Sequence, residues 1–160
     1  MKPADLDVFD IRLLAALQAA GRAPNAQLAD SVGLSASQVS RRLARLEETG
    51  VIAGYAALLR PEAVGLSVTA FSNISLERHS DTLVRNFQQS VTARPEILEC
   101  WSVTGEADFV LRIVAADLKA FADFMMLHLL RLPGVRSARS SIVLHRIKQT
   151  TALPLDHVGG

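Results

Sequence analysis

The sequence predicts an α+β protein with two domains, and two observations lead to that prediction. Residues 5–50 contain three helical patterns of apolar residues separated by glycines, whereas residues 67–148 alternate between strand and helix patterns. Between these stretches, Arg60-Pro61-Glu62 breaks the apolar pattern. The predicted parts are an N-terminal domain at 1–59, a linker at 60–66, a C-terminal domain at 67–148 and a tail at 149–160.

The first predicted helix covers residues 5–20 and supplies an apolar floor for the two helices that follow. Asp5 or Asp7 can cap its start, and Gly21 ends it. Its apolar residues recur at helical spacing and are expected to share the buried face: Val8, Ile11, Leu14 and Leu17.

Residues 25–50 predict two short helices joined by a tight turn. Asn25 is expected to cap the first helix, and Gly33 supplies the unhindered backbone that the turn needs. Ser35 followed by Gln38 is a capping box that starts the second helix. The expected buried positions are Leu28, Ala29 and Val32 in the first helix and Val39, Leu43 and Leu46 in the second, which Gly50 ends.

The outer face of the second helix is basic and polar. Helical geometry places Ser37, Gln38, Arg41 and Arg45 opposite the buried positions, with Arg42 on the flank. Arginine and glutamine read guanine and adenine edges in the major groove, and a helix N-terminus with short side chains accepts phosphates. This polarity indicates a DNA-binding helix-turn-helix. The alternative is an ordinary helical hairpin with a solvated basic face.

Residues 51–59 have strand character and follow the two helices directly. Val51, Ile52 and Tyr55 favour strands, and Gly54 can form a turn. A short ribbon at this place would be the wing of a winged helix-turn-helix.

The C-terminal domain predicts a ferredoxin-like αβ-sandwich with the order βαββαβ. Both helices of such a unit cover one face of the sheet, and the apolar or small residues on the other face predict that a second copy covers it, giving a homodimer. The expected strands are 67–76, 97–104, 109–114 and 135–147, and the expected helices are 80–93 and 117–129. The residues expected to point inward are Leu83, Val84, Phe87 and Val91 in the first helix and Leu118, Phe121, Phe124 or Met125, and Leu129 in the second.

Composition narrows the classes of function. With a net charge of +1 over 160 residues, affinity for nucleic acid must come from a local patch, and one small patch again favours a dimer. Asp5, Asp7 and Asp10 break any apolar run near the start, so we expect no signal peptide. No apolar segment approaches the length needed to cross a bilayer, so we expect no membrane span and a cytoplasmic protein. The single cysteine, Cys100, lies in an apolar run and is expected to be buried.

No catalytic, metal or cofactor motif is recognised. His79, His128, His145 and His157 show no metal-ligand spacing, and the sequence contains neither a nucleophile elbow nor a Walker loop. Trp101 is interpreted as an interface or core residue.

Five segments in register make the chain resemble the Lrp/AsnC transcriptional regulators, also called feast/famine regulators, over essentially its whole length. The segments are Asp7–Leu17, Gly21–Ala29, Val32–Leu59, Val103–Ile113 and Leu132–Lys148. The resemblance implies dimers, commonly assembled into octamers, that bind double-stranded DNA and respond to an amino acid or related metabolite. It also implies that residues 36–49 form the recognition helix, with Ser37, Gln38, Arg41 and Arg42 facing the major groove or its phosphates.

The family's effector site lies between dimers, near a Gly-x-x-Asp turn that here consists of Gly105, Glu106, Ala107 and Asp108 and follows Thr104. Amide groups of such a turn can hold a carboxylate, and Asp108 can pair with an ammonium group. Ser140 stands where many members have a threonine, whereas Ala138 stands where some have a second hydroxyl. The alternative from spacing alone is a plain hairpin loop.

Two other classes of function remain open. Sirohaem decarboxylases resemble this two-domain family but do not need a basic recognition helix, so Arg41, Arg42 and Arg45 count against an enzyme. The third class is an interaction protein that only forms heteromers with related regulators. Binding of the purified protein to the DNA upstream of its own gene would separate a regulator from an enzyme and from an interaction protein.

Overall fold

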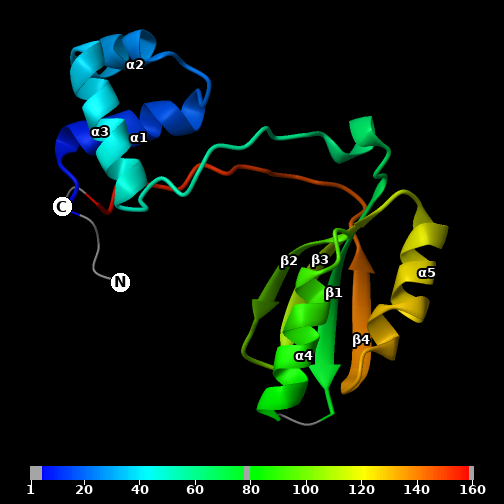
Figure 1. The fold of residues 1–160 in the computed structure, drawn as a ribbon. Helices are drawn as coiled ribbons and strands as arrows, with labels where there is room; N and C mark the ends of the chain where they lie inside the picture. The colour runs from blue at the N-terminus through cyan, green and yellow to red at the C-terminus, as the bar shows by residue number, and fades with distance from the viewer. Residues whose placement is uncertain (1–4, 78–79, 159–160) are drawn as a thin grey trace. The chain divides into compact units, whose positions relative to one another are not determined.

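The computed structural model describes residues 5–77 and 80–158 and divides the chain into two compact units. One unit contains the chain up to Ala57 together with residues from Lys148 onward, and the other is Leu58–Ile147. Each unit has its own hydrophobic core, and the elements of both are labelled in Figure 1. The C-terminal segment, predicted as a separate tail, is therefore part of the N-terminal unit.

The N-terminal unit contains α1 (Val8–Ala19), α2 (Asn25–Val32) and α3 (Ala36–Glu48). The turn between α2 and α3 has Gly33 in the left-handed region (φ 72°), and the Ser35–Gln38 capping box starts α3. Both features confirm the sequence prediction. The predicted core positions of α2 and α3 are buried, and they are Leu28, Ala29, Val32, Val39, Leu43 and Leu46.

Two predictions for this unit are wrong in detail. The buried residues of α1 are Asp10, Leu13 and Leu14, whereas Val8 is 53% exposed. The expected face was rotated because a hydrophobicity pattern does not count a buried aspartate. Asn25 is the first residue of α2, and the residue before it, Pro24, makes no side-chain cap. Asp7 caps α1 through a reciprocal capping box with Asp10.

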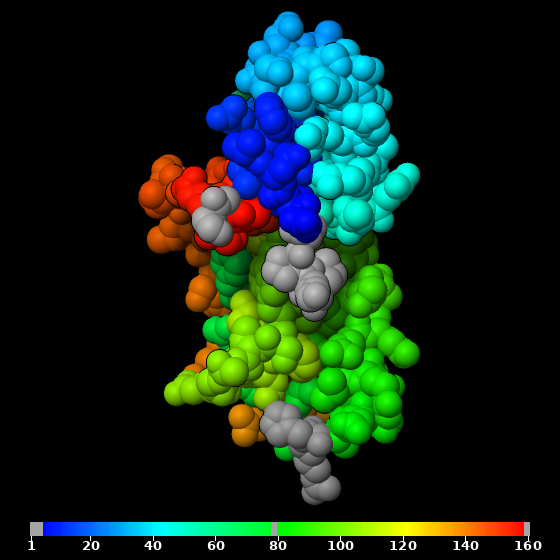
Figure 2. Space-filling view, turned by 90° about the vertical axis from the view of Figure 1, so that its left-hand side faces the viewer, coloured from blue at the N-terminus to red at the C-terminus, as the bar shows by residue number. Residues whose placement is uncertain are grey.

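The C-terminal segment returns to α1. Leu153 N donates to Gln18 Oε1 (2.6 Å), and Gln18 Nε2 donates to Leu153 O (3.2 Å). Leu155 packs against the core of the three helices. In Figure 2 this red segment lies beside the blue residues of the first helix.

Residues 51–60 contain no strand, so the predicted wing is not formed in this segment. The segment is attached to α3 instead: Ile52 N donates to Leu46 O (3.0 Å), and Tyr55 Oη donates to Glu47 Oε1 (2.7 Å). A strand requires a hydrogen-bonded neighbour, and these residues have none of that kind. Burial and the bond to Glu47 raise the pKa of Tyr55 to about 12.

The C-terminal unit is the predicted ferredoxin-like sandwich. Its antiparallel sheet has the order β2-β3-β1-β4, and the core lies between the sheet and the helices (Figure 1). The elements are η1 (Pro61–Val64), β1 (Val68–Leu76), α4 (Asp81–Thr92), β2 (Ile97–Ser102), β3 (Phe109–Ala115), α5 (Leu118–Leu127), η2 (Leu129–Arg131) and β4 (Val135–Ile142).

Register decides which side chains share a face of this sheet. Paired residues of adjacent antiparallel strands point to the same side. One row across the sheet is Cys100, Leu111, Ser72 and Ser140, on the face that α4 and α5 cover. The next row is Trp101, Val110, Asn73 and Arg139, on the other, open face, where Phe71 (40%) and Trp101 (44%) are partly exposed.

Three further expectations for this unit are corrected. β4 ends at Ile142, well before Ile147, because β1 begins at Val68 and offers no partner beyond it; Leu144 is 96% exposed. Leu118, the first residue of α5, is 58% exposed. Cys100 is exposed because β2 is an edge strand, although partial burial still raises the pKa of its thiol.

Candidate functional site

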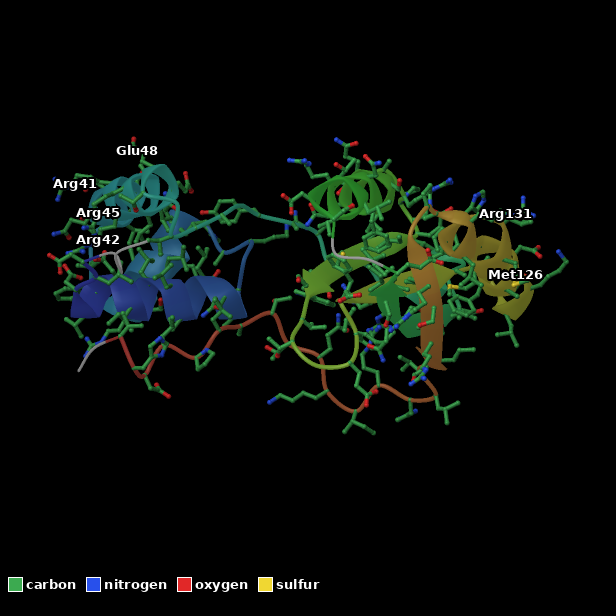
Figure 3. All side chains as sticks on the ribbon, turned by 90° about the horizontal axis from the view of Figure 1, so that it is seen from below. Arg41, Arg42, Arg45, Glu48, Met126 and Arg131 are labelled. Carbon is green, nitrogen blue, oxygen red and sulfur yellow. The ribbon has the colours of Figure 1, made fainter. Side chains whose placement is uncertain are left out.

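The recognition helix α3 presents its polar residues away from the core. Ser37, Gln38 and Arg41 are exposed. The side-chain oxygen of Gln38 accepts a hydrogen bond from Ser35 N (2.9 Å) in the capping box. The amide NH₂ group of Gln38 is therefore the part of the side chain that faces outward. Among the described residues, Arg41 has no ion pair, and Figure 3 shows it at the outer side of α3.

Arg42 and Arg45 are placed differently, because both contact carboxylates of α1. Arg42 Nη1 lies 2.7 Å from Asp10 Oδ1 and 2.8 Å from Asp7 Oδ2. Arg45 Nη2 donates to Asp10 Oδ2. The sequence predicted five DNA-binding side chains, and the structure groups two of them with α1.

The ionisation of this cluster follows from its contacts. Burial opposes ionisation of Asp10, but hydrogen bonds from Arg45 and Arg42 outweigh it and lower the pKa of its carboxyl group. The backbone hydrogen bond from Asp10, with Arg42 beside it, lowers the pKa of Asp7. Hydrogen bonds to Asp7 and Asp10 raise the pKa of Arg42. All three groups are therefore charged near neutral pH.

Sequence reasoning missed Asp10 as a partner of the recognition helix. The sequence signal for Asp10 was its spacing from Asp7, which forms a capping box. This spacing predicts how α1 begins but not which residues of another helix contact Asp10. The arginine partners lie 32 and 35 residues further along the chain.

A hollow of about 650 Å³ lies beside the turn between β2 and β3, on the open face of the sheet. Glu106 supplies an acidic group and Arg136 and Arg139 supply basic groups at its wall, with Arg139 Nη1 4.0 Å from Glu106 Oε2. The lining residues are Asn73, Ser75, Val103, Thr104, Glu106, Ala107, Val110, Arg136, Ser137 and Arg139. Thr104, Glu106 and Ala107 were expected at this site from the sequence.

Asp108 holds the turn to the sheet. Leu76 N donates to Asp108 Oδ2 (2.7 Å), Asp108 N donates to Ile74 O (2.9 Å), and Val103 N donates to Asp108 O (3.1 Å). Gly105 adopts φ 112°, a conformation that favours glycine. These contacts give Asp108 a structural task, whereas the sequence predicted a ligand contact for it.

Ser140 does not reach the hollow. It lies on the helix-covered side of the sheet, with its Oγ 2.8 Å from Ser72 Oγ and 4.0 Å from Met125 Sδ. The structure therefore separates this residue from Thr104 and the Gly105–Asp108 turn, with which the sequence prediction had grouped it.

Residues 5–77 and 80–158 contain neither a candidate metal site nor a candidate membrane span. In that part of the chain, no group of three or more His, Cys, Asp or Glu residues is placed to hold a metal ion. No helix there is both long and apolar enough to cross a membrane. His79 lies outside the described residues.

A helix-turn-helix unit with a basic second helix defines a DNA-binding protein, and the comparisons with known proteins assign its family. Residues 6–47 match the AsnC-type helix-turn-helix domain, and residues 69–153 match the Lrp/AsnC ligand binding domain. The chain belongs to the Lrp/AsnC family of DNA-binding transcriptional regulators.

Relatives match along nearly their whole length. A leucine-responsive regulatory protein of Rhizobium meliloti is 38% identical over 90% of this chain and 92% of its own. The DNA-binding transcriptional activator DecR of Escherichia coli is 38% identical over 94% of this chain and 99% of its own. A transcriptional regulator of Neisseria meningitidis, crystallised with L-Met, is 44% identical with a TM-score of 0.92 over 96% of this chain and 99% of that one. These relatives are named as regulators.

Proposed function

We propose that α3 enters the major groove of operator DNA and reads it with Ser37, Gln38 and Arg41. The burial of Val39, Leu43 and Leu46 is the observation that carries this proposal, because it turns the opposite side of α3 outward. Arg42 and Arg45 complete the DNA-binding set that the sequence predicted, and both form ion pairs with α1. Because a transcriptional regulator must reach DNA, we expect this protein in the cytoplasm.

The test is binding of the purified protein to the DNA upstream of its own gene. Fluorescence anisotropy would compare this fragment with a shuffled fragment of the same length and composition at several salt concentrations. Selective binding supports the proposal, and equal affinity for both fragments at every salt concentration contradicts it for this DNA.

We further propose an amino acid as the effector, bound in the hollow beside the Gly105–Asp108 turn. The hollow has the size of small-molecule sites, which commonly measure about 300–1,000 Å³. Arg136 or Arg139 would pair with the carboxylate and Glu106 with the ammonium group. Gly105 and Asp108 shape the turn, and Thr104 and Ala107 line the wall. The L-Met complex of the Neisseria relative supports this class of ligand.

Calorimetry of the full-length protein with a panel of L-amino acids would test the effector, beginning with methionine and leucine. D-methionine and methionine amide serve as controls for stereochemistry and for the carboxylate. Binding of an L-amino acid with loss of affinity for its amide supports a carboxylate contact. Equal binding of the acid and its amide contradicts that contact.

We also propose that the open sheet face forms the homodimer and that dimers assemble further, toward an octamer. The apolar side chains of Phe71 and Trp101 are partly exposed on this face, and single chains rarely keep large apolar patches uncovered. The hollow lies at the same face, so assembly and ligand binding would be linked. Light scattering with and without the amino acid identified by calorimetry measures the size of the assembly and its dependence on the ligand.

A further inference from the structure

Asp10 carries a fully buried carboxylate at the start of the DNA-binding unit. A buried carboxylate is costly unless it is paired and hydrogen-bonded. Its side-chain donors both come from α3, Arg42 Nη1 at 2.7 Å and Arg45 Nη2. Moving either arginine away removes a donor from this buried charge, so the two guanidinium groups are held in place strongly.

Arg42 is the more enclosed of the two arginines. Its Nη1 also contacts Asp7 Oδ2 at 2.8 Å, and its guanidinium carbon lies 5.5 Å from the centre of the Phe9 ring, a cation–π distance. Its side chain is 24% exposed, against 48% for Arg45. In Figure 3 both arginines lie on the α1 side of α3, whereas Arg41 lies further out.

The charges of this cluster cancel, since two carboxylates face two guanidinium groups. Contacts to phosphates give affinity without sequence information, and each neutralised phosphate adds to the salt dependence of binding. A phosphate that took Arg42 or Arg45 from α1 would leave Asp10 buried with a missing donor. The cluster therefore competes with phosphates for two of the three arginines on α3.

We propose that Asp7 and Asp10 form a carboxylate clamp that positions Arg42 and Arg45 along α1 and withholds them from DNA phosphates. The clamp suppresses sequence-independent binding, so that α3 discriminates DNA through Ser37, Gln38 and Arg41. Asp10 is thus a positioning residue that acts through the arginines. The inference rests on α3 being the DNA-reading helix.

The first variant is Asp7→Asn, because asparagine also caps helices well and the start of α1 is kept. Asp10→Asn is the second, stronger variant. Asp5→Asn is the matched control: Asp5 is exposed near the same helix end, it forms no ion pair among the described residues, and its change adds the same charge. Circular dichroism and thermal melting establish that each variant is folded.

Affinity for random-sequence DNA is measured between low and moderate salt. For each arginine released, the slope of log Kobs against log[salt] should steepen by up to about 0.9. Binding to random DNA should tighten in Asp7→Asn and more in Asp10→Asn, relative to Asp5→Asn. The preference for the upstream fragment over random DNA should fall in the same order.

Two results overturn the clamp. Slopes and preferences that match Asp5→Asn in both folded variants would show that the carboxylates only hold α1 to α3. Equal weakening on both DNAs, with a flatter slope, would show that the clamp presents the arginines to phosphates instead of withholding them. If Asp10→Asn does not fold, Asp7→Asn decides the question alone.

Side-chain NMR of the unaltered protein separates the clamp from the proposed function. Held guanidinium groups give slowly exchanging signals, and those of Arg42 and Arg45 should keep their shifts on adding random DNA while the signal of Arg41 moves. Shifts of all three signals together would overturn the clamp. This measurement and the salt slopes need no operator, so absence of selective binding would count against the proposed function alone.

Discussion

Gln18 and Leu153 are 135 residues apart in the sequence and pair through two hydrogen bonds. The side-chain amide of Gln18 meets both the N–H and the C=O of Leu153, as a neighbouring strand would. With Leu155 packed on the same core, the C-terminal segment becomes a stabilising part of the DNA-binding unit.

Gln18→Ala should therefore destabilise the N-terminal unit. A hydrogen bond contributes about 0.5–1.5 kcal/mol net, and this variant loses two exposed ones, so the effect should lie near the lower end of that range for each. Gln27→Ala is the control, because Gln27 is exposed on α2 and its side chain forms no hydrogen bond with the described residues. Urea unfolding followed by circular dichroism measures both, and equal midpoints would contradict the role of the segment.

The N-terminal unit should lose stability in acid through Asp10. The pKa of Asp10 is lowered in the folded state, so its contribution is fully present above its unfolded pKa of about 4. It is lost as the pH falls through the lowered value. The melting temperature of the unit should drop below about pH 4, less steeply in Asp10→Asn than in Asp5→Asn. Parallel curves for the two variants would contradict this assignment.

Arg41→Ala and Arg45→Ala should differ in stability. Arg41→Ala removes an exposed side chain that forms no ion pair with the described residues, so it should weaken DNA binding by about 1–3 kcal/mol at an unchanged melting temperature. Arg45→Ala removes a donor from the buried Asp10 and should lower the melting temperature. DNA titrations and melting curves of both variants check this. Full affinity in Arg41→Ala would mean that another face of α3 meets DNA.

Glu106 and Asp108 should separate ligand binding from stability. Glu106→Gln keeps the turn and removes the charge of the proposed ammonium partner. The Glu106 side chain is 98% exposed and exposed ion pairs contribute about 0.2–1 kcal/mol, so the amino-acid response should weaken by up to about fivefold while basal DNA binding stays. Asp108→Ala leaves Leu76 N without its acceptor and should destabilise the C-terminal unit by about 1–3 kcal/mol. Calorimetry and melting curves test the pair. An unchanged response in Glu106→Gln would move the ammonium site elsewhere.

Phe71→Glu should produce monomers. It places a charge in the middle of the open face, where a buried unpaired carboxylate would oppose dimer formation. Met126→Glu is the control, because Met126 is 63% exposed on α5, away from the open face (Figure 3). Light scattering at micromolar concentration reads the mass, and a Phe71→Glu protein that remains at least dimeric refutes this interface.

Local patterns determined the parts of the fold that depend on neighbours in sequence. The capping box at Ser35 and Gln38, the glycine turn at Gly33 and the buried row of Val39, Leu43 and Leu46 follow from spacings of one helical turn or two. The order βαββαβ likewise followed from the alternation of strand and helix periodicities. Such features need no knowledge of what packs from afar.

Only the tertiary structure decided which polar groups meet. Asp10 became buried because α3 brings two arginines to it, and no periodicity of α1 encodes that contact. The wing was not formed because residues 51–60 found no strand to pair with. The face taken by Ser140 depends on strand register, where a shift of one residue turns every side chain to the other side of the sheet. These outcomes depend on long-range pairing, which the sequence expresses only through the whole fold.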